Sequence, residues 1–221
     1  MGKRLLGAAL AVAVGVTVSA CAGAGPGNPG TFVPAGGSGQ AANGQAAPGT
    51  AAPVPGLRNF AFPPSIKIVF QTPLPAGGPQ RSAMIGYENY IDSMWYAVYT
   101  HGANTAYERY LSGNALKFAQ GEISEFASGD YALRGTITYY NMDVPQVFFK
   151  AGAVVTSCVD ASGLYRVSAR TGKTAGTVFS GGFSHYQEQA SAGKQPGGLW
   201  MIGHTANYPA TSGGSAGECA A

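Results

Sequence analysis

The spacing of apolar residues changes once along this chain, from a helical period to a strand period. A short alternation at Ile66, Ile68 and Phe70 comes first, and Pro73 and Pro75 end this leading strand. Apolar residues then recur three and four positions apart, which is the stripe of a long amphipathic helix. The members of this stripe are Met84, Tyr87, Ile91, Met94, Trp95 and Val98.

Two shorter helices are predicted after the long one, which Gly102 stops. Thr105 and Glu108 have the spacing of a capping box, so a second helix is expected to run as far as about Gly113. Asn114 is a suitable cap for a third helix, whose apolar face extends over residues 115–126.

From residue 131 the period drops to two, which predicts strands around residues 133–139 and over residues 147–159, 164–170, 177–190 and 199–206. Glycine-containing turns at residues 160–163, 170–173 and 192–198 are expected to join antiparallel neighbours. Gly181 and Gly182 suggest a bulge that curves the sheet. Helices followed by such a meander predict an α+β fold in which a curved sheet wraps round the long helix.

Residues 21–64 differ from the rest in composition. They are rich in Gly, Ala and Pro, and Arg58 is their only charge, so we expect a disordered tether ahead of a folded domain over residues 65–221. A coil of about 40 residues has a root-mean-square reach of roughly 35 Å. A disordered tail without a role has the same composition.

The first 20 residues have the order of an export signal. Lys3 and Arg4 precede an uncharged stretch, and residues 18–21 read Val-Ser-Ala-Cys. This pattern resembles the lipobox of exported bacterial lipoproteins. The resemblance implies that Cys21 carries the lipid, that residues 1–20 are removed, and that acyl chains hold the protein on the extracytoplasmic face of the cell membrane.

Two alternatives compete with this interpretation. Ala20, Cys21 and Ala22 also fit the cleavage site of an ordinary secretory signal. A retained transmembrane helix fits less well, because the apolar run is short for a bilayer core and rich in Gly and Ala.

The charges of the chain argue against nucleic acid as a partner. The 13 basic and 10 acidic residues become 11 and 10 without Lys3 and Arg4, a net charge of +1, and no basic run interleaved with aromatics follows. His101, His185 and His204 are scattered and lack metal-ligand spacing. We therefore expect no metal site and no cofactor.

If Cys21 carries lipid, Cys158 and Cys219 remain as an even pair in an exported protein, which favours a disulfide that pins the C-terminal tail. Two free buried thiols are the alternative.

The order of elements resembles the nuclear transport factor 2-like (NTF2-like) superfamily, and residues 198–202, Gly-Leu-Trp-Met-Ile, resemble its common closing strand. The tether, residues 157–160 (Ser-Cys-Val-Asp) and the C-terminal cysteine resemble actinobacterial lipoproteins. The resemblance to the NTF2-like superfamily implies a cone in which a long helix and two shorter helices pack on a curved antiparallel sheet.

Enzymes of this superfamily place an acidic or imidazole base inside the cone, opposite tyrosine or carboxylic acid donors. The weak catalytic candidates here are His185 and Asp92, with Glu88 and His204 nearby in the pattern; Asp92 is offset from the apolar stripe and is expected to be solvated. The residues that could line a pocket are Tyr87, Trp95, Tyr139, Tyr186 and Trp200. Aromatic residues at core spacing more often serve packing.

The sequence therefore favours a lipid-anchored envelope protein whose domain binds a protein partner or an apolar small molecule without catalysis. An extracytoplasmic acid/base enzyme of the isomerase or dehydratase type is the alternative, and a structural module that assembles through its sheet is a third. A filled cone would favour binding or assembly, and an open cone with inward acid/base groups would favour the enzyme.

Overall fold

The computed structural model describes residues 56–179, 183–210 and Cys219. These residues belong to one compact unit, Ala51–Ala221. The predicted signal peptide, the lipid site at Cys21, most of the tether and the predicted bulge at Gly181 and Gly182 lie outside the described residues.

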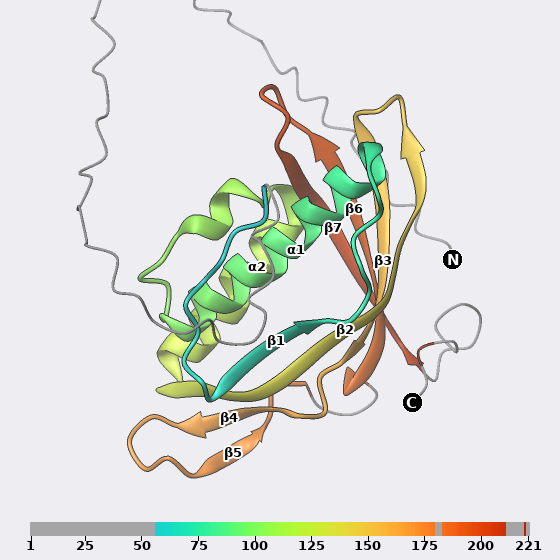
Figure 1. The fold of residues 1–221 in the computed structure, drawn as a ribbon. Coiled ribbons are helices and arrows are strands. Elements are labelled where there is room, and N and C mark those ends of the chain that lie inside the picture. Colours follow the sequence, from blue (N-terminus) through green and yellow to red (C-terminus); the bar gives the residue numbers. More distant parts are fainter. Residues whose placement is uncertain (1–55, 180–182, 211–218, 220–221) are drawn as a thin grey trace, which may run out of the picture. The chain divides into compact units, whose positions relative to one another are not determined.

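Two helices pack on a curved antiparallel sheet, so the fold is α+β (Figure 1). The helical elements are α1 (Gly78–Tyr99), the 3₁₀ turn η1 (Ala106–Arg109) and α2 (Gly113–Ser128). The strands are β1 (Ile66–Phe70), β2 (Tyr131–Phe148), β3 (Gly152–Asp160), β4 (Leu164–Ser168), β5 (Thr174–Thr177), β6 (His185–Lys194) and β7 (Trp200–Pro209). None of the described helices is both long and apolar enough to cross a membrane.

Helix α1 has recognisable start and stop signals. Pro79 occupies its first turn, where a missing backbone N–H costs nothing. At the other end, Gly102 takes a φ of +80° and its N–H donates to Ala97 O over 2.8 Å. His101 is also left-handed with a φ of +51°, and its N–H donates to Val98 O over 3.1 Å, so His101 and Gly102 together satisfy terminal carbonyls and end the helix.

The second predicted helix is wrong. Thr105 makes no side-chain cap, and the segment forms a single 3₁₀ turn. The chain then extends toward β7, where Ser112 N–H donates to Ile202 O and Ile202 N–H donates to Tyr110 O, over 2.9 and 2.8 Å. These bonds to β7 take the place of helical bonds.

The sheet is not the predicted meander. Its strand order is β5-β4-β2-β3-β6-β7, and β1 pairs with β2 in parallel. β3 and β4 both pair with the long strand β2, over Thr138–Phe148 and Tyr131–Gly135 respectively, instead of with each other. The predicted strand over residues 147–159 in fact contains the β2–β3 turn at Phe149 and Lys150. Register shifts within β2 near Asp143 are of the kind that bend a sheet.

The core lies between α1 and the concave side of the sheet (Figure 1). α1 buries the whole apolar stripe. Its Gly86 meets β7 closely, since a Cβ at this position would lie 2.6 Å from Trp200 Cβ. Burial of each large side chain in this layer contributes about 1.5–3 kcal/mol.

Two connections tie Cys219, near the C-terminal end, to the sheet. The predicted disulfide is confirmed, because Cys158 on β3 is bonded to Cys219. Tyr140 Oη also donates to Cys219 O over 2.8 Å.

The predicted tether boundary at residue 64 is too late. Residues 56–62, which we call the strap, lie on α1. Asn89 Oδ1 accepts from Arg58 N–H over 2.7 Å, and Asn89 Nδ2 donates to Gly56 O over 2.9 Å. Phe60 and Phe62 also pack their rings 5.2 and 5.4 Å from that of Tyr96.

Candidate functional site

The interior of the sheet is filled by the aromatic residues that were candidates for a pocket. Tyr87, Trp95, Tyr139, Tyr186 and Trp200 are each at most 2% exposed. Tyr87 Oη and Ser157 Oγ are 2.7 Å apart, and Trp95 Nε1–H donates to Tyr139 Oη over 3.0 Å. The polar atoms of Tyr87, Trp95 and Tyr139 are thus paired inside the core, as buried polar groups require, whereas Trp200 Nε1 has no hydrogen-bond partner among the described residues.

Ring packing closes this layer further. The Tyr87 ring lies 5.8 Å from that of Tyr90, edge to face, and the Phe179 ring lies 6.1 Å from Trp95 and 5.6 Å from Tyr186. Such edge-to-face pairs add about 0.5–1.5 kcal/mol each beyond the burial of their area.

Glu188 on β6 is a buried carboxyl that the sequence analysis missed. Burial raises its pKa to about 7, while hydrogen bonding with the Tyr87 and Tyr90 hydroxyls lowers the pKa by a smaller amount. Its Oε1 has no hydrogen-bond partner among the described residues. The signal was present in the alternation of β6, where Tyr186, Glu188 and Ala190 share the buried face.

The two histidine candidates do not join this interior. His185 begins β6, and its Nε2 lies 3.3 Å from Asp160 Oδ1 at the paired end of β3. Its side chain is 27% exposed, and His204 is exposed. The described residues show no contact between His185 and either Asp92 or Glu88, so the structure does not bring the expected acid/base pair together.

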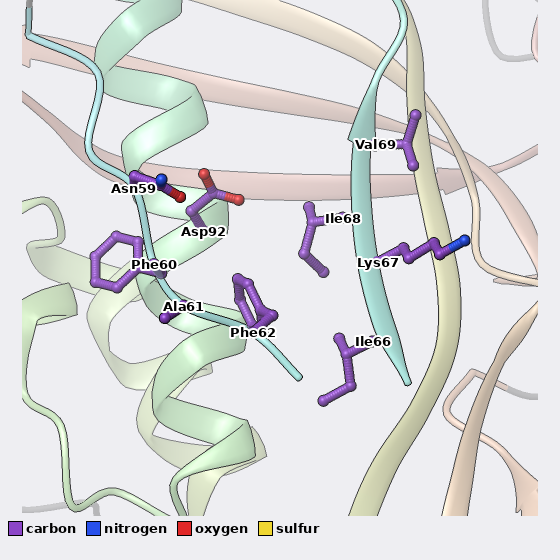
Figure 2. Close-up of a pocket in the computed structure, with 9 residues that line it drawn as sticks. All are labelled: Asn59, Phe60, Ala61, Phe62, Ile66, Lys67, Ile68, Val69 and Asp92. Carbon is purple, nitrogen blue, oxygen red and sulfur yellow. The ribbon is translucent and has the colours of Figure 1, made fainter. Parts of the chain in front are cut away.

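A cleft of about 560 Å³ lies outside the filled core, between the strap, α1 and β1 (Figure 2). Its lining residues are Asn59, Phe60, Ala61, Phe62, Ile66, Lys67, Ile68, Val69 and Asp92. In Figure 2 the side chains of Ile66 and Ile68 point from β1 toward the cleft, whereas that of Lys67 points away. Asp92 reaches into the cleft from α1.

Asp92 is not solvated as expected. Burial, and to a smaller extent the negative charge of Glu88 one helical turn earlier, raise the pKa of Asp92 to about 7. The pKa of Glu88 is also raised to about 7 by burial, against a smaller lowering by Arg81. Both carboxyls therefore change charge near neutral pH.

Asn89 lines a smaller cavity of about 200 Å³. Gly56 of the strap, Gly86 of α1 and Trp200 of β7 are among its lining residues. Of the five predicted pocket residues, Trp200 thus borders a cavity, although its side chain is 2% exposed.

No family model and no curated protein matches the chain. Among solved structures, the intermembrane-space region of the chloroplast protein ARC6 is similar, with 13% identity and a TM-score of 0.35 over 56% of this chain and 94% of that one. A Shewanella frigidimarina protein described as a ketosteroid isomerase has 13% identity and a TM-score of 0.31 over 55% of this chain and 94% of that one. Likeness at this level carries no argument about activity.

Proposed function

We propose that this chain is a lipid-anchored cell-envelope protein whose NTF2-like unit is a non-catalytic binding or assembly module. The observation that supports this function is the filled interior. The five candidate pocket residues are each at most 2% exposed, and Tyr87, Trp95 and Tyr139 are hydrogen-bonded in the core. These side chains therefore serve packing and are not accessible to a substrate.

The cleft beside β1 is the binding site in this proposal. Ligand sites are typically concave and mostly apolar, with a few polar groups that orient the ligand. The cleft is concave and combines apolar side chains, such as Phe62, Ile66 and Ile68, with polar surface that includes the carboxyl of Asp92. The strap forms one wall, and Asn89 fixes that wall to α1.

The anchor is supported by the sequence of residues 1–21 and is tested separately. Changing Cys21→Ala should move the protein from the membrane fraction to the soluble fraction of the envelope, because the acyl chains supply the membrane affinity. Unchanged membrane retention of this variant would contradict the anchor.

Binding is tested by native pull-down from an envelope extract of the cells that produce the protein. Captured proteins and extractable small molecules are then identified. Ile68→Asp places a charge in the cleft and should abolish capture. Lys117→Ala, at an exposed position on α2 outside the cleft lining, is the control and should retain capture. Identical captured sets for wild type and both variants would contradict the cleft as the binding site.

An extracytoplasmic acid/base enzyme acting on an apolar small molecule is the second candidate, and one observation favours it. A carboxyl with a pKa of about 7 in a cleft, as at Asp92, has the property of a general acid or base at neutral pH. The test is deuterium exchange at the α-carbon of a simple apolar ketone such as cyclohexanone, measured by mass spectrometry. Exchange that is faster with wild type than with Asp92→Asn would favour the enzyme, and equal exchange would favour binding alone.

A further inference from the structure

We propose that the open edge of β1 accepts a strand from a partner protein, in the form of an extended segment with alternating apolar side chains and one lysine or arginine facing Asp92. This inference rests on the proposed function, since it names the occupant of the same cleft.

The backbone of β1 shows which groups are free. Ser65 O accepts from Gly135 N–H over 2.7 Å at the start of the strand, and Gln71 N–H donates to Tyr139 O over 2.9 Å at its end. In a strand, the N–H and C=O groups of alternate residues point to the same edge. Odd-numbered residues of β1 therefore bond to β2, and Ile66, Ile68 and Phe70 present their backbone groups to the opposite edge.

That opposite edge is largely unpaired. Ile66 N–H donates to Pro63 O over 2.9 Å. The C=O of Ile66, both backbone groups of Ile68 and the N–H of Phe70 have no backbone partner among the described residues, where β1 pairs only with β2. An unpaired strand edge is a template for another strand, and several peptide-binding domains use it in this way.

The unpaired edge coincides with the cleft, since Ile66 and Ile68 line it. A purely apolar small molecule would leave the Ile68 N–H and C=O without partners in an apolar setting, which is unfavourable. An extended polypeptide satisfies both groups. It also offers side chains at intervals of two residues, which matches the apolar surface of Phe62, Ile66 and Ile68.

Charge complementarity selects the central side chain of the added segment. Asp92 and Glu88 are one helical turn apart, and the negative charge of Glu88 raises the pKa of Asp92. Arg81 acts on Glu88, and the side chain of Lys67 points away from the cleft. Asp92 is thus the carboxyl among the residues that line the cleft, and a lysine or arginine opposite it compensates its charge.

The test uses the full chain carrying Cys21→Ala, with its disulfide intact, and a capped heptapeptide. Threonine occupies the odd positions of the peptide, and valine, lysine and valine occupy positions two, four and six. Amide hydrogen exchange is followed by NMR at about 5 mM peptide, a concentration that reveals even millimolar affinity. The amides of Ile68 and Phe70 should become protected at least about fivefold, while those of Lys67 and Val69, already bonded to β2, should change much less.

Matched peptides and variants separate strand addition from general stickiness. A peptide N-methylated on the amides that face β1 should lose the protection, as should the variant Ile68→Pro, which lacks the edge N–H but keeps the ladder to β2. Ile68→Val retains that donor and should bind within about threefold of wild type. Replacing the peptide lysine by glutamate should weaken binding about tenfold, and Asp92→Asn should remove most of this preference.

Several results would overturn the inference. These are absence of protection at Ile68 and Phe70, equal binding of the N-methylated peptide, and light scattering that shows a dimer closed through β1. The peptide comparison remains decisive even if Ile68→Pro fails to fold. If Ile68→Asp abolishes capture in the pull-down but β1 amides gain no protection, the proposed function stands and strand addition is wrong.

Discussion

Trp95 Nε1–H donates a hydrogen bond of 3.0 Å to Tyr139 Oη, and both side chains are almost completely buried. This contact joins α1 to β2 across the interior of the sheet. It satisfies the one polar atom of the indole inside an apolar layer, so the two residues specify each other's position.

Changing Tyr139→Phe should lower the free energy of unfolding by about 1–3 kcal/mol, because it leaves the Trp95 indole N–H buried without a partner. Urea unfolding measures the effect. Tyr165→Phe, on a side chain that is 37% exposed, is the matched control and should change stability by less than about 0.5 kcal/mol. Equal stability of the two variants would show that the interior hydrogen bond contributes little.

The stability of the protein should fall as the pH rises from about 5 to 8. Burial raises the pKa values of Glu88, Asp92 and Glu188 to about 7, above the ordinary values of 4.5, 3.8 and 4.5. Between the ordinary and the raised pKa values the folded state binds more protons than the unfolded state, so the free energy of unfolding decreases as the pH rises. Thermal unfolding across this range measures the slope.

Asp92→Asn should flatten that slope and stabilise the protein at pH 8 by on the order of 1 kcal/mol, since it removes a buried group that must ionise. Asp130→Asn, at an exposed position, is the matched control and should leave the slope unchanged. A wild-type protein whose stability rises over the same range would contradict the burial of these carboxyls.

Substitutions in the β2–β3 turn should stabilise the protein. Phe149 is 99% exposed, Phe149 and Lys150 have φ values of +49° and +57°, and Ala151 N–H donates to Phe148 O over 2.9 Å. Asn-Gly is the preferred pair for a two-residue turn of this kind. Phe149→Asn combined with Lys150→Gly should therefore raise the free energy of unfolding by about 1–2 kcal/mol.

Phe149→Ala separates the ring from the backbone, because it removes the exposed side chain and keeps the unfavourable φ. Its stability should lie within about 0.5 kcal/mol of wild type. If this variant gains as much as the Asn-Gly pair, backbone strain is not the cause.

The disulfide should contribute about 4 kcal/mol in the chain-entropy model, since it closes a loop of sequence separation 61. Changing both Cys158→Ser and Cys219→Ser should remove this contribution in chemical unfolding. Wild type treated with reductant should match the variant. Non-reducing peptide mapping that finds both cysteines as free thiols would contradict the bond.

Much of the architecture was predictable from local signals. The buried stripe of α1 follows the helical period, and the pairing of Cys158 with Cys219 follows from an even count once Cys21 is assigned to lipid. Sheet topology was not predictable in the same way. The meander assumption joined strands that are neighbours in sequence, whereas β3 and β4 both pair with β2, and β1 reaches β2 across both helices.

Two features of the candidate site, the packing of the strap and the place of Asp92, could not be predicted from composition. The strap has the composition of the tether, but Phe60 and Phe62 anchor it on Tyr96, and Asp92 lies in the cleft that this segment walls. Glu188 was recoverable from the alternation of β6. The open edge of β1 could not be predicted from the sequence, because it depends on the pairing of β1 with β2 along its opposite edge.

Tryptophan fluorescence tests the filled interior most directly, because the chain has two tryptophans and both lie in this layer, Trp95 at 0% and Trp200 at 2% exposure. A filled interior predicts blue-shifted emission and an acrylamide quenching constant far below that of free tryptophan, with the same result for Trp95 alone in a Trp200→Phe variant. Water-like emission with quenching close to that of free tryptophan would show an open cone and contradict a binding module with a packed core.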